Sequence, residues 1–171
     1  GERIGSHEGR MVRYAQEGYA FHFIDTRGNG GETEGLPFGQ QMVTQDYERF
    51  EKGMMPQYFM SVCDLTAAQK LLTDRFHVPV YVMGSSNGGR YAAVAAGTNP
   101  EFAGYVGIST SDWGLQESVT GQGLTGDPVR FAASIEPGTS IRRIAPRPVW
   151  IFHAAEDPFI PIEAGEELFS R

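Results

Sequence analysis

The sequence predicts an α/β protein with a doubly wound, mostly parallel β-sheet. The first observation is that segments with helical periodicity alternate with short apolar segments along the chain. The second is that the apolar segments, such as "VPVYVM" and "RPVWIF", are continuous rather than alternating, which is typical of strands covered on both faces. A chain of 171 residues suits one domain with its own core, so we expect a single domain over residues 1–171.

The N-terminal part is expected to contain a helix, a strand and a long irregular segment. Residues 6–16 are predicted as a helix with Ser6 as its N-cap and Gly18 as its stop signal. Residues 19–25, "YAFHFID", are aromatic and apolar and predict a strand that runs into a glycine-rich loop. Residues 36–56 are rich in Met and Gln, and we expect them to be irregular.

The rest of the chain is predicted to alternate between helices and strands. Apolar residues at helical spacing predict a helix that ends near Phe76, and an alanine-rich segment predicts another over residues 88–97. Beyond these we expect strands at residues 78–83, 102–110 and 147–154, and helices at about residues 128–135 and from residue 161 onward. This order is the one that a parallel sheet with helical connections requires.

The composition argues against several classes of function. The net charge is -7 and the Lys and Arg residues are scattered, so we expect no nucleic-acid partner. Cys63 is the single cysteine, which leaves no zinc-type spacing, and we expect neither a metal nor another cofactor. No apolar run approaches the ~18 residues that span a bilayer. We therefore expect a soluble protein, either cytoplasmic or exported.

The stretch "GSSNGG" places Ser86 between glycines two residues away on each side. The bare pattern is weak, but an apolar strand runs into it and an alanine-rich helix runs out of it. A turn this sharp strains its central residue, and we expect Gly84 and Gly88 to prevent clashes there. Such a turn raises the Ser86 hydroxyl above the carboxyl edge of the sheet and directs the backbone N–H of Asn87 at a developing oxyanion.

Three segments together resemble the α/β-hydrolase superfamily. The first, "GYAFHFIDTRGNG", resembles its fourth strand and the D-x-R-G-x-G loop, and "GSSNGG" resembles its nucleophile elbow. The third, "SIRRIAPRPVWIFHAAEDPFIP", resembles its seventh strand with the loop that carries the acid. Further segments are similar to the acetyl-xylan-esterase, dienelactone-hydrolase and S9-peptidase side of the superfamily. The resemblance implies a serine hydrolase that cleaves a small-molecule carboxylic ester through an acyl-enzyme, without a cofactor or a metal.

The resemblance also implies roles for particular residues. Ser86 matches the nucleophile, Asn87 the residue whose amide forms half of the oxyanion hole, and Asp157 the acid that orients the base. Asp112 is an alternative acid, because some members place it after the sixth strand. Residues 112–146 match a short cap. Two other functions stay open, namely a peptidase or amidase of the same fold and a non-catalytic binding protein.

None of the four histidines fits the general base that such a site needs. His22 falls inside a predicted strand and is expected in the core, and His77 precedes the strand of the motif and so lies at the opposite edge. His153 lies within the last strand, and His7 comes before the serine, against the order of the family. We therefore expect the base beyond Arg171, in a longer hydrolase that adds the first strands and the last strand with its histidine loop.

Overall fold

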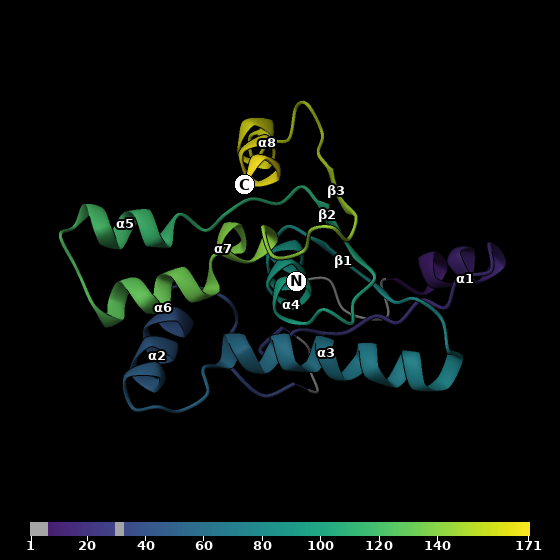
Figure 1. The fold of residues 1–171 in the computed structure, drawn as a ribbon, viewed down its shortest axis with the longest axis horizontal. Helices are drawn as coiled ribbons and strands as arrows, with labels where there is room; N and C mark the ends of the chain where they lie inside the picture. The colour runs from purple at the N-terminus through teal and green to yellow at the C-terminus, as the bar shows by residue number, and fades with distance from the viewer. Residues whose placement is uncertain (1–6, 30–32) are drawn as a thin grey trace. The chain divides into compact units, whose positions relative to one another are not determined.

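The computed structural model describes residues 7–29 and 33–171 (Figure 1). The described residues form a mixed α/β structure with eight helices and an open, three-stranded parallel sheet. The structure therefore confirms the predicted α/β class. The chain divides into two compact units, Gly1–Ser61 and Val62–Arg171, which are described one at a time. The predicted N-cap at Ser6 lies outside the described residues.

The sheet belongs to the unit Val62–Arg171 and confirms the three later strand predictions. Its strands are parallel and lie in the order of the sequence. Ser85 lies opposite Ile108, and Ile108 lies opposite Phe152, so all three strands end at the same level. The residues that follow the strands therefore gather at one edge of the sheet. The strands are β1 (Tyr81–Ser85), β2 (Gly104–Ile108) and β3 (Val149–Phe152).

One face of this sheet is covered by α4 (Asn87–Thr98), which packs on β1 and β2. The helix is buried almost all round, and its run of small side chains, Ala92–Ala96, allows close packing. The opposite face of the sheet carries exposed apolar side chains. Trp150 and Phe152 point to it from β3 and remain 44% and 59% exposed. Within this unit, α4 therefore forms a helical layer on one face of the sheet, while β3 keeps apolar side chains accessible on the second face.

The cap segment predicted at residues 112–146 folds into three short helices. The expected helix is confirmed as α6 (Asp127–Ile135), while α5 (Leu115–Gly121) and α7 (Pro137–Ile141) were not predicted. A single carboxylate organises the start of α5, because Glu136 accepts hydrogen bonds from the amides of Trp113, Leu115 and Gln116 at 2.8, 2.6 and 3.3 Å. Burial raises the pKa of Glu136 above its ordinary value. After β3, the predicted C-terminal helix is confirmed as α8 (Ile162–Ser170).

In the unit Gly1–Ser61 the helix α1 (Glu8–Gln16) confirms its prediction, but the strand that should follow does not form. Residues 19–25 have no strand pairing among the described residues. Their alternate aromatic side chains pack back onto α1 and the residue before it instead, with Phe21 stacked on Tyr14 at 4.8 Å and Phe23 on His7 at 4.1 Å between ring centroids. The strand prediction is wrong, because an apolar pattern with period two also suits an extended segment that packs on a helix without a hydrogen-bonded neighbour.

The prediction of an irregular segment at residues 36–56 is also wrong, because α2 (Gln40–Glu51) lies there. It is followed by α3 (Gln57–Phe76), the predicted helix that ends at Phe76. Only Met42 and Asp46 of α2 are fully buried, but Val43, Tyr47 and Phe50 are half-buried and stand at helical spacing, a signal that the prediction missed. The Asp46 carboxylate accepts hydrogen bonds from the amides of Gln57 and Tyr58 at 2.6 and 2.8 Å and so caps α3.

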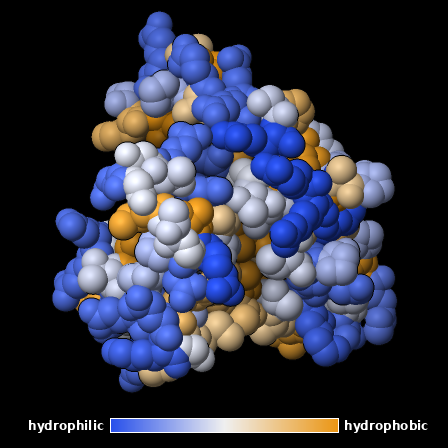
Figure 2. Space-filling model, turned by 60° about the vertical axis from the view of Figure 1, so that its left-hand side comes forward, coloured by the Kyte–Doolittle hydropathy of each residue, from blue (hydrophilic) through white to orange (hydrophobic). Residues whose placement is uncertain are grey.

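Charged and polar side chains cover most of the face drawn in Figure 2, with smaller apolar patches between them. This distribution agrees with a chain that carries 35 Lys, Arg, Asp and Glu residues, 14 basic and 21 acidic. Within residues 7–29 and 33–171, no helix is both long and apolar enough to cross a membrane.

Candidate active site at the carboxyl edge of the sheet

Ser86 stands between β1 and the first residue of α4, in a conformation that is uncommon for residues other than glycine. Its φ is 52° and its ψ is -121°. Contacts from the next strand hold this strained backbone in place: the Ser86 amide donates to the Ile108 carbonyl at 2.9 Å, and its carbonyl accepts from the Thr110 hydroxyl at 3.1 Å. The side chain is exposed. The turn thus presents a hydroxyl to solvent at the carboxyl edge of the sheet.

Two glycines make this turn possible, and one of them was not expected. A Cβ on Gly84 would overlap the backbone carbonyl of Gly88, and a Cβ on Gly89 would lie 2.8 Å from the Cβ and Oγ1 of Thr110. A Cβ on Gly88 would meet no atom within 4 Å. The expectation is therefore right for Gly84 and wrong for Gly88. Gly89 was missed because its constraint comes from a residue that follows another strand.

Asn87 is the first residue of α4, so its amide lies at the positive end of a helix. Among the described residues, none accepts a hydrogen bond from this amide. The Asn87 side chain, in contrast, is held in place, because its Oδ1 accepts from Nη1 of Arg90 at 3.1 Å. The backbone N–H next to Ser86 is therefore available to a negatively charged oxygen.

Asp157 lies in the loop that follows β3, where backbone amides hold its carboxylate. Its Oδ1 accepts from the amides of Phe159 and Ile160 at 2.9 and 3.0 Å. The Ile160 amide, followed by the Phe159 amide and the Ser109 side chain, lowers the pKa of Asp157 below its ordinary value. Asp157 is therefore a carboxylate over the whole neutral and mildly acidic range.

Ser86 follows β1 and Asp157 follows β3, and these strands lie on either side of β2. Both residues therefore lie at the same edge of the sheet. The Ser86 amide is bonded to the last residue of β2, and the Ser109 amide is bonded to the last residue of β3, Phe152, at 2.8 Å. Because the Ser109 side chain also contacts the Asp157 carboxylate, that carboxylate lies at the end of β2. Neighbouring strands are about 4.8 Å apart. The structure thus brings the predicted nucleophile and acid to neighbouring positions.

The alternative acid, Asp112, faces a different part of the fold. Its Oδ1 accepts from the Gly138 amide of α7 at 2.5 Å, and its Oδ2 lies 3.9 Å from Nε of Arg171. Burial raises the pKa of Asp112, while the Gly138 amide and then the Arg171 charge oppose that rise. These contacts direct the carboxylate toward α7 and the end of the chain.

Among the described residues, neither histidine of the unit Val62–Arg171 is hydrogen-bonded to Ser86. Nε2 of His153 donates to the Ile160 carbonyl at 2.7 Å and lies 3.8 Å from Oδ2 of Asp157. The ring is 5% exposed, so it braces the loop that contains Asp157. His77 lies between α3 and β1, at the amino end of the strand and therefore at the opposite edge of the sheet.

The other two histidines lie in the unit Gly1–Ser61. His7 is buried and stacks on Phe23. His22 is exposed, so the expectation of a core residue is wrong. It fails with the strand prediction, because His22 lies in a segment without a paired strand and not inside a sheet.

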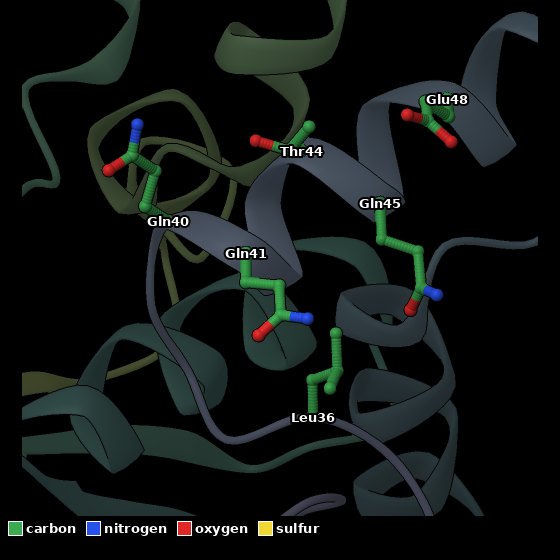
Figure 3. A pocket seen from close by; sticks show the side chains of 6 residues that line it. All are labelled: Leu36, Gln40, Gln41, Thr44, Gln45 and Glu48. Carbon is green, nitrogen blue, oxygen red and sulfur yellow. The ribbon is translucent and has the colours of Figure 1, made fainter.

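Each unit also has a hollow, and neither hollow includes Ser86. A cavity of about 720 Å³ lies among α5, α7 and α8, where Asp112 and Trp113 line it. A hollow of about 640 Å³ beside α2 is drawn in Figure 3, which shows three glutamine side chains among the residues around it. Its lining residues are Leu36, Gln40, Gln41, Thr44, Gln45 and Glu48. Neither lining contains a nucleophile paired with a base.

No set of three or more His, Cys, Asp or Glu residues within residues 7–29 and 33–171 is arranged to hold a metal ion. In comparisons with known proteins, no protein-family model matches the chain, and no curated protein matches it in sequence. Function is therefore inferred from the geometry at the sheet edge.

Proposed function

We propose that this chain is the core of a serine hydrolase of the α/β-hydrolase type, which cleaves a carboxylic ester through an acyl-enzyme. The observation that carries the proposal is the strained backbone of Ser86 at a strand-to-helix turn, with its hydroxyl exposed. A strained residue in this position is typical of a nucleophile elbow. The proposal includes the doubly wound form of the fold, in which helices cover the second sheet face as well.

In the first half of the reaction, Oγ of Ser86 attacks the ester carbonyl carbon while its proton passes to a general base. The negative charge that develops on the carbonyl oxygen is stabilised by the N–H of Asn87 at the start of α4. The tetrahedral intermediate then expels the alcohol, which takes the proton from the base. A water molecule attacks the acyl-enzyme in the same manner and releases the carboxylic acid and free Ser86.

Asp157 is the acid that orients the base in this proposal. Its low pKa keeps it ionised, so it can stabilise the imidazolium that forms when the base takes the proton. Its position at the end of β2 supports it over Asp112, whose carboxylate is held by α7. The base itself is proposed to be a histidine from outside the unit Val62–Arg171, because His77 and His153 are placed elsewhere.

A fluorophosphonate probe tests the proposal on the intact protein. The probe should form a covalent adduct on Ser86, which peptide mass spectrometry locates, and Ser86→Ala should abolish it. Ser85→Ala is the matched control, because Ser85 is also exposed but ends β1 in the wrong register. Absence of an adduct on Ser86, or equal labelling after Ser86→Ala, would contradict the proposal. Rates on p-nitrophenyl esters and on matching anilides then separate an esterase from an amidase.

A further inference from the structure

Arg90 lies in the first turn of α4, three residues after Asn87, and its guanidinium is held on several sides. Nη1 donates to Oδ1 of Asn87 at 3.1 Å. Nε donates to the carbonyl of Ser111 at 2.9 Å, and Nη2 donates to the hydroxyl of the same residue at 2.6 Å. The plane of the group lies over the Trp113 indole, with Cζ 4.0 Å from the ring centroid. One side chain therefore connects the elbow with the loop that follows β2.

These contacts use properties that only arginine has. The two hydrogen bonds to Ser111 come from the adjacent Nε and Nη2 atoms, which form a rigid, planar fork. The third N–H group points to Asn87, while the flat face stacks on Trp113. A lysine ammonium could replace one of these contacts but not the whole set.

The connection completes a series of contacts between the elbow and the segment after β2. The Ser86 amide is bonded to Ile108, and the Ser86 carbonyl to Thr110. Arg90 then bonds the next residue along the chain, Asn87, to Ser111. Ser86 and Asn87 are thus connected to successive positions at the end of β2 and in the loop after it. Because Trp113 and Ser111 also line the cavity among α5, α7 and α8, the same contacts join the elbow to the cap segment.

We propose that Arg90 is a positioning residue for the oxyanion donor, fixing Asn87 and the strained elbow against the loop at residues 111–113. This inference rests on the proposed hydrolase function. The oxyanion donor has to meet an atom that exists only in the transition state, so a small displacement lowers the rate of the chemical step more than it weakens substrate binding. Misplacement by about 1 Å can lower such a rate by about 100-fold.

The test compares Arg90→Gln and Arg90→Lys in the intact protein with Arg75→Gln as the matched control. Arg75 also contacts an aromatic ring, with its Cζ 5.4 Å from the Phe76 centroid, but it lies at the end of α3, before β1. We expect the limiting rate of Ser86 labelling and kcat to fall by about tenfold or more in both Arg90 variants, with the probe dissociation constant and KM changing by less than about twofold. Arg75→Gln should match the wild type.

Two further variants keep the inference testable if Arg90→Gln folds poorly. Ser111→Ala removes one of the anchors and should lower kcat in the same direction by a smaller factor. Asn87→Ala keeps the backbone amide but removes the acceptor, and its effect on kcat should be non-additive with that of Arg90→Lys. Wild-type labelling with unchanged kcat in the Arg90 variants, or an effect on KM alone, overturns the role of Arg90 only. Failure to label the wild type overturns the proposed function and this inference together.

Discussion

Ser86 shows how a single strained residue depends on its neighbours. Its positive φ costs of the order of 1–3 kcal/mol for a residue with a side chain, so other contacts must hold it. Hydrogen bonds to Ile108 and Thr110 fix its peptide groups, and the absence of a side chain at Gly84 lets the start of α4 approach the strand. The strain is therefore maintained by the end of β2 and the residues after it, and by glycines that allow close approach.

A pair of glycine substitutions tests this account of the elbow. Gly84→Ala places a Cβ against the Gly88 carbonyl and should destabilise the fold by about 1–3 kcal/mol, as overpacking does. Gly88→Ala has open space and replaces a helical glycine, so it should be neutral or stabilise by up to about 1 kcal/mol. Urea unfolding measures both. Equal destabilisation by the two substitutions would show that the turn is not crowded as described.

How well a site residue could be predicted depends on how far along the sequence its contacts lie. Ser86 and its turn could be predicted because the strand, the glycines and the helix follow one another directly in the sequence. Asp157 was predicted from a resemblance, and its amide partners at residues 159 and 160 are equally local. Arg90 was not singled out, because its partner Ser111 is 21 residues away and no local pattern indicates that contact.

At the scale of elements, the three strands of the sheet could be predicted, while α2 and the segment at residues 19–25 were predicted wrongly. The α2 helix has apolar residues at helical spacing, Val43, Tyr47 and Phe50, so the signal was present in the sequence and was overlooked among the Met and Gln residues around it. The strand prediction at residues 19–25 fails for a different reason. Its apolar pattern is real, but strand formation depends on a neighbouring strand, which local sequence does not reveal.

The cap of α3 by a side chain of α2 leads to a prediction at this scale. Asp46 is fully buried, and Asp46→Ala would leave the amides of Gln57 and Tyr58 without their acceptor. We expect a loss of about 1–3 kcal/mol in the free energy of unfolding, together with faster hydrogen exchange at these two amides. Gln45→Ala, one residue earlier on the exposed side of α2, should change neither. Unchanged exchange after Asp46→Ala would contradict the capping role.

For the molecule as a whole, the pH dependence of stability reflects carboxyl groups whose pKa values are shifted in opposite directions. Burial raises the pKa of Asp46, Asp112 and Glu136 above their ordinary values. Amide hydrogen bonds lower the pKa of Asp157. A raised pKa means that the folded state favours the protonated carboxyl. The stabilisation that this gives is complete at a pH below the ordinary pKa and is lost as the pH rises through the pKa of the folded state. A lowered pKa means that the folded state favours the carboxylate. The stabilisation that this gives is complete at a pH above the ordinary pKa and is lost as the pH falls through the pKa of the folded state.

Asp157→Asn and Asp112→Asn should therefore change stability with opposite signs. Asp157→Asn should destabilise the protein near pH 7, and its difference from the wild type should shrink as the pH falls below the ordinary value of 3.8. Asp112→Asn keeps an acceptor for the Gly138 amide and removes a buried charge, so it should be neutral or stabilising near pH 7. Urea unfolding at several pH values measures both. If both variants were destabilised to the same extent and with the same pH dependence, the opposite directions of the two pKa shifts would be contradicted.

Local patterns in the chain were enough to place the α/β alternation, the three strands and the turn at Ser86. These features depend on periodicity and on glycines that lie within a few residues of one another. The tertiary structure was needed to show that Gly89 rather than Gly88 is crowded, that Asp112 faces α7, and that Arg90 joins the elbow to the cap segment. Each of these depends on atoms from residues about 20 or more positions apart, which become neighbours only when parallel strands bring their carboxyl ends to one edge.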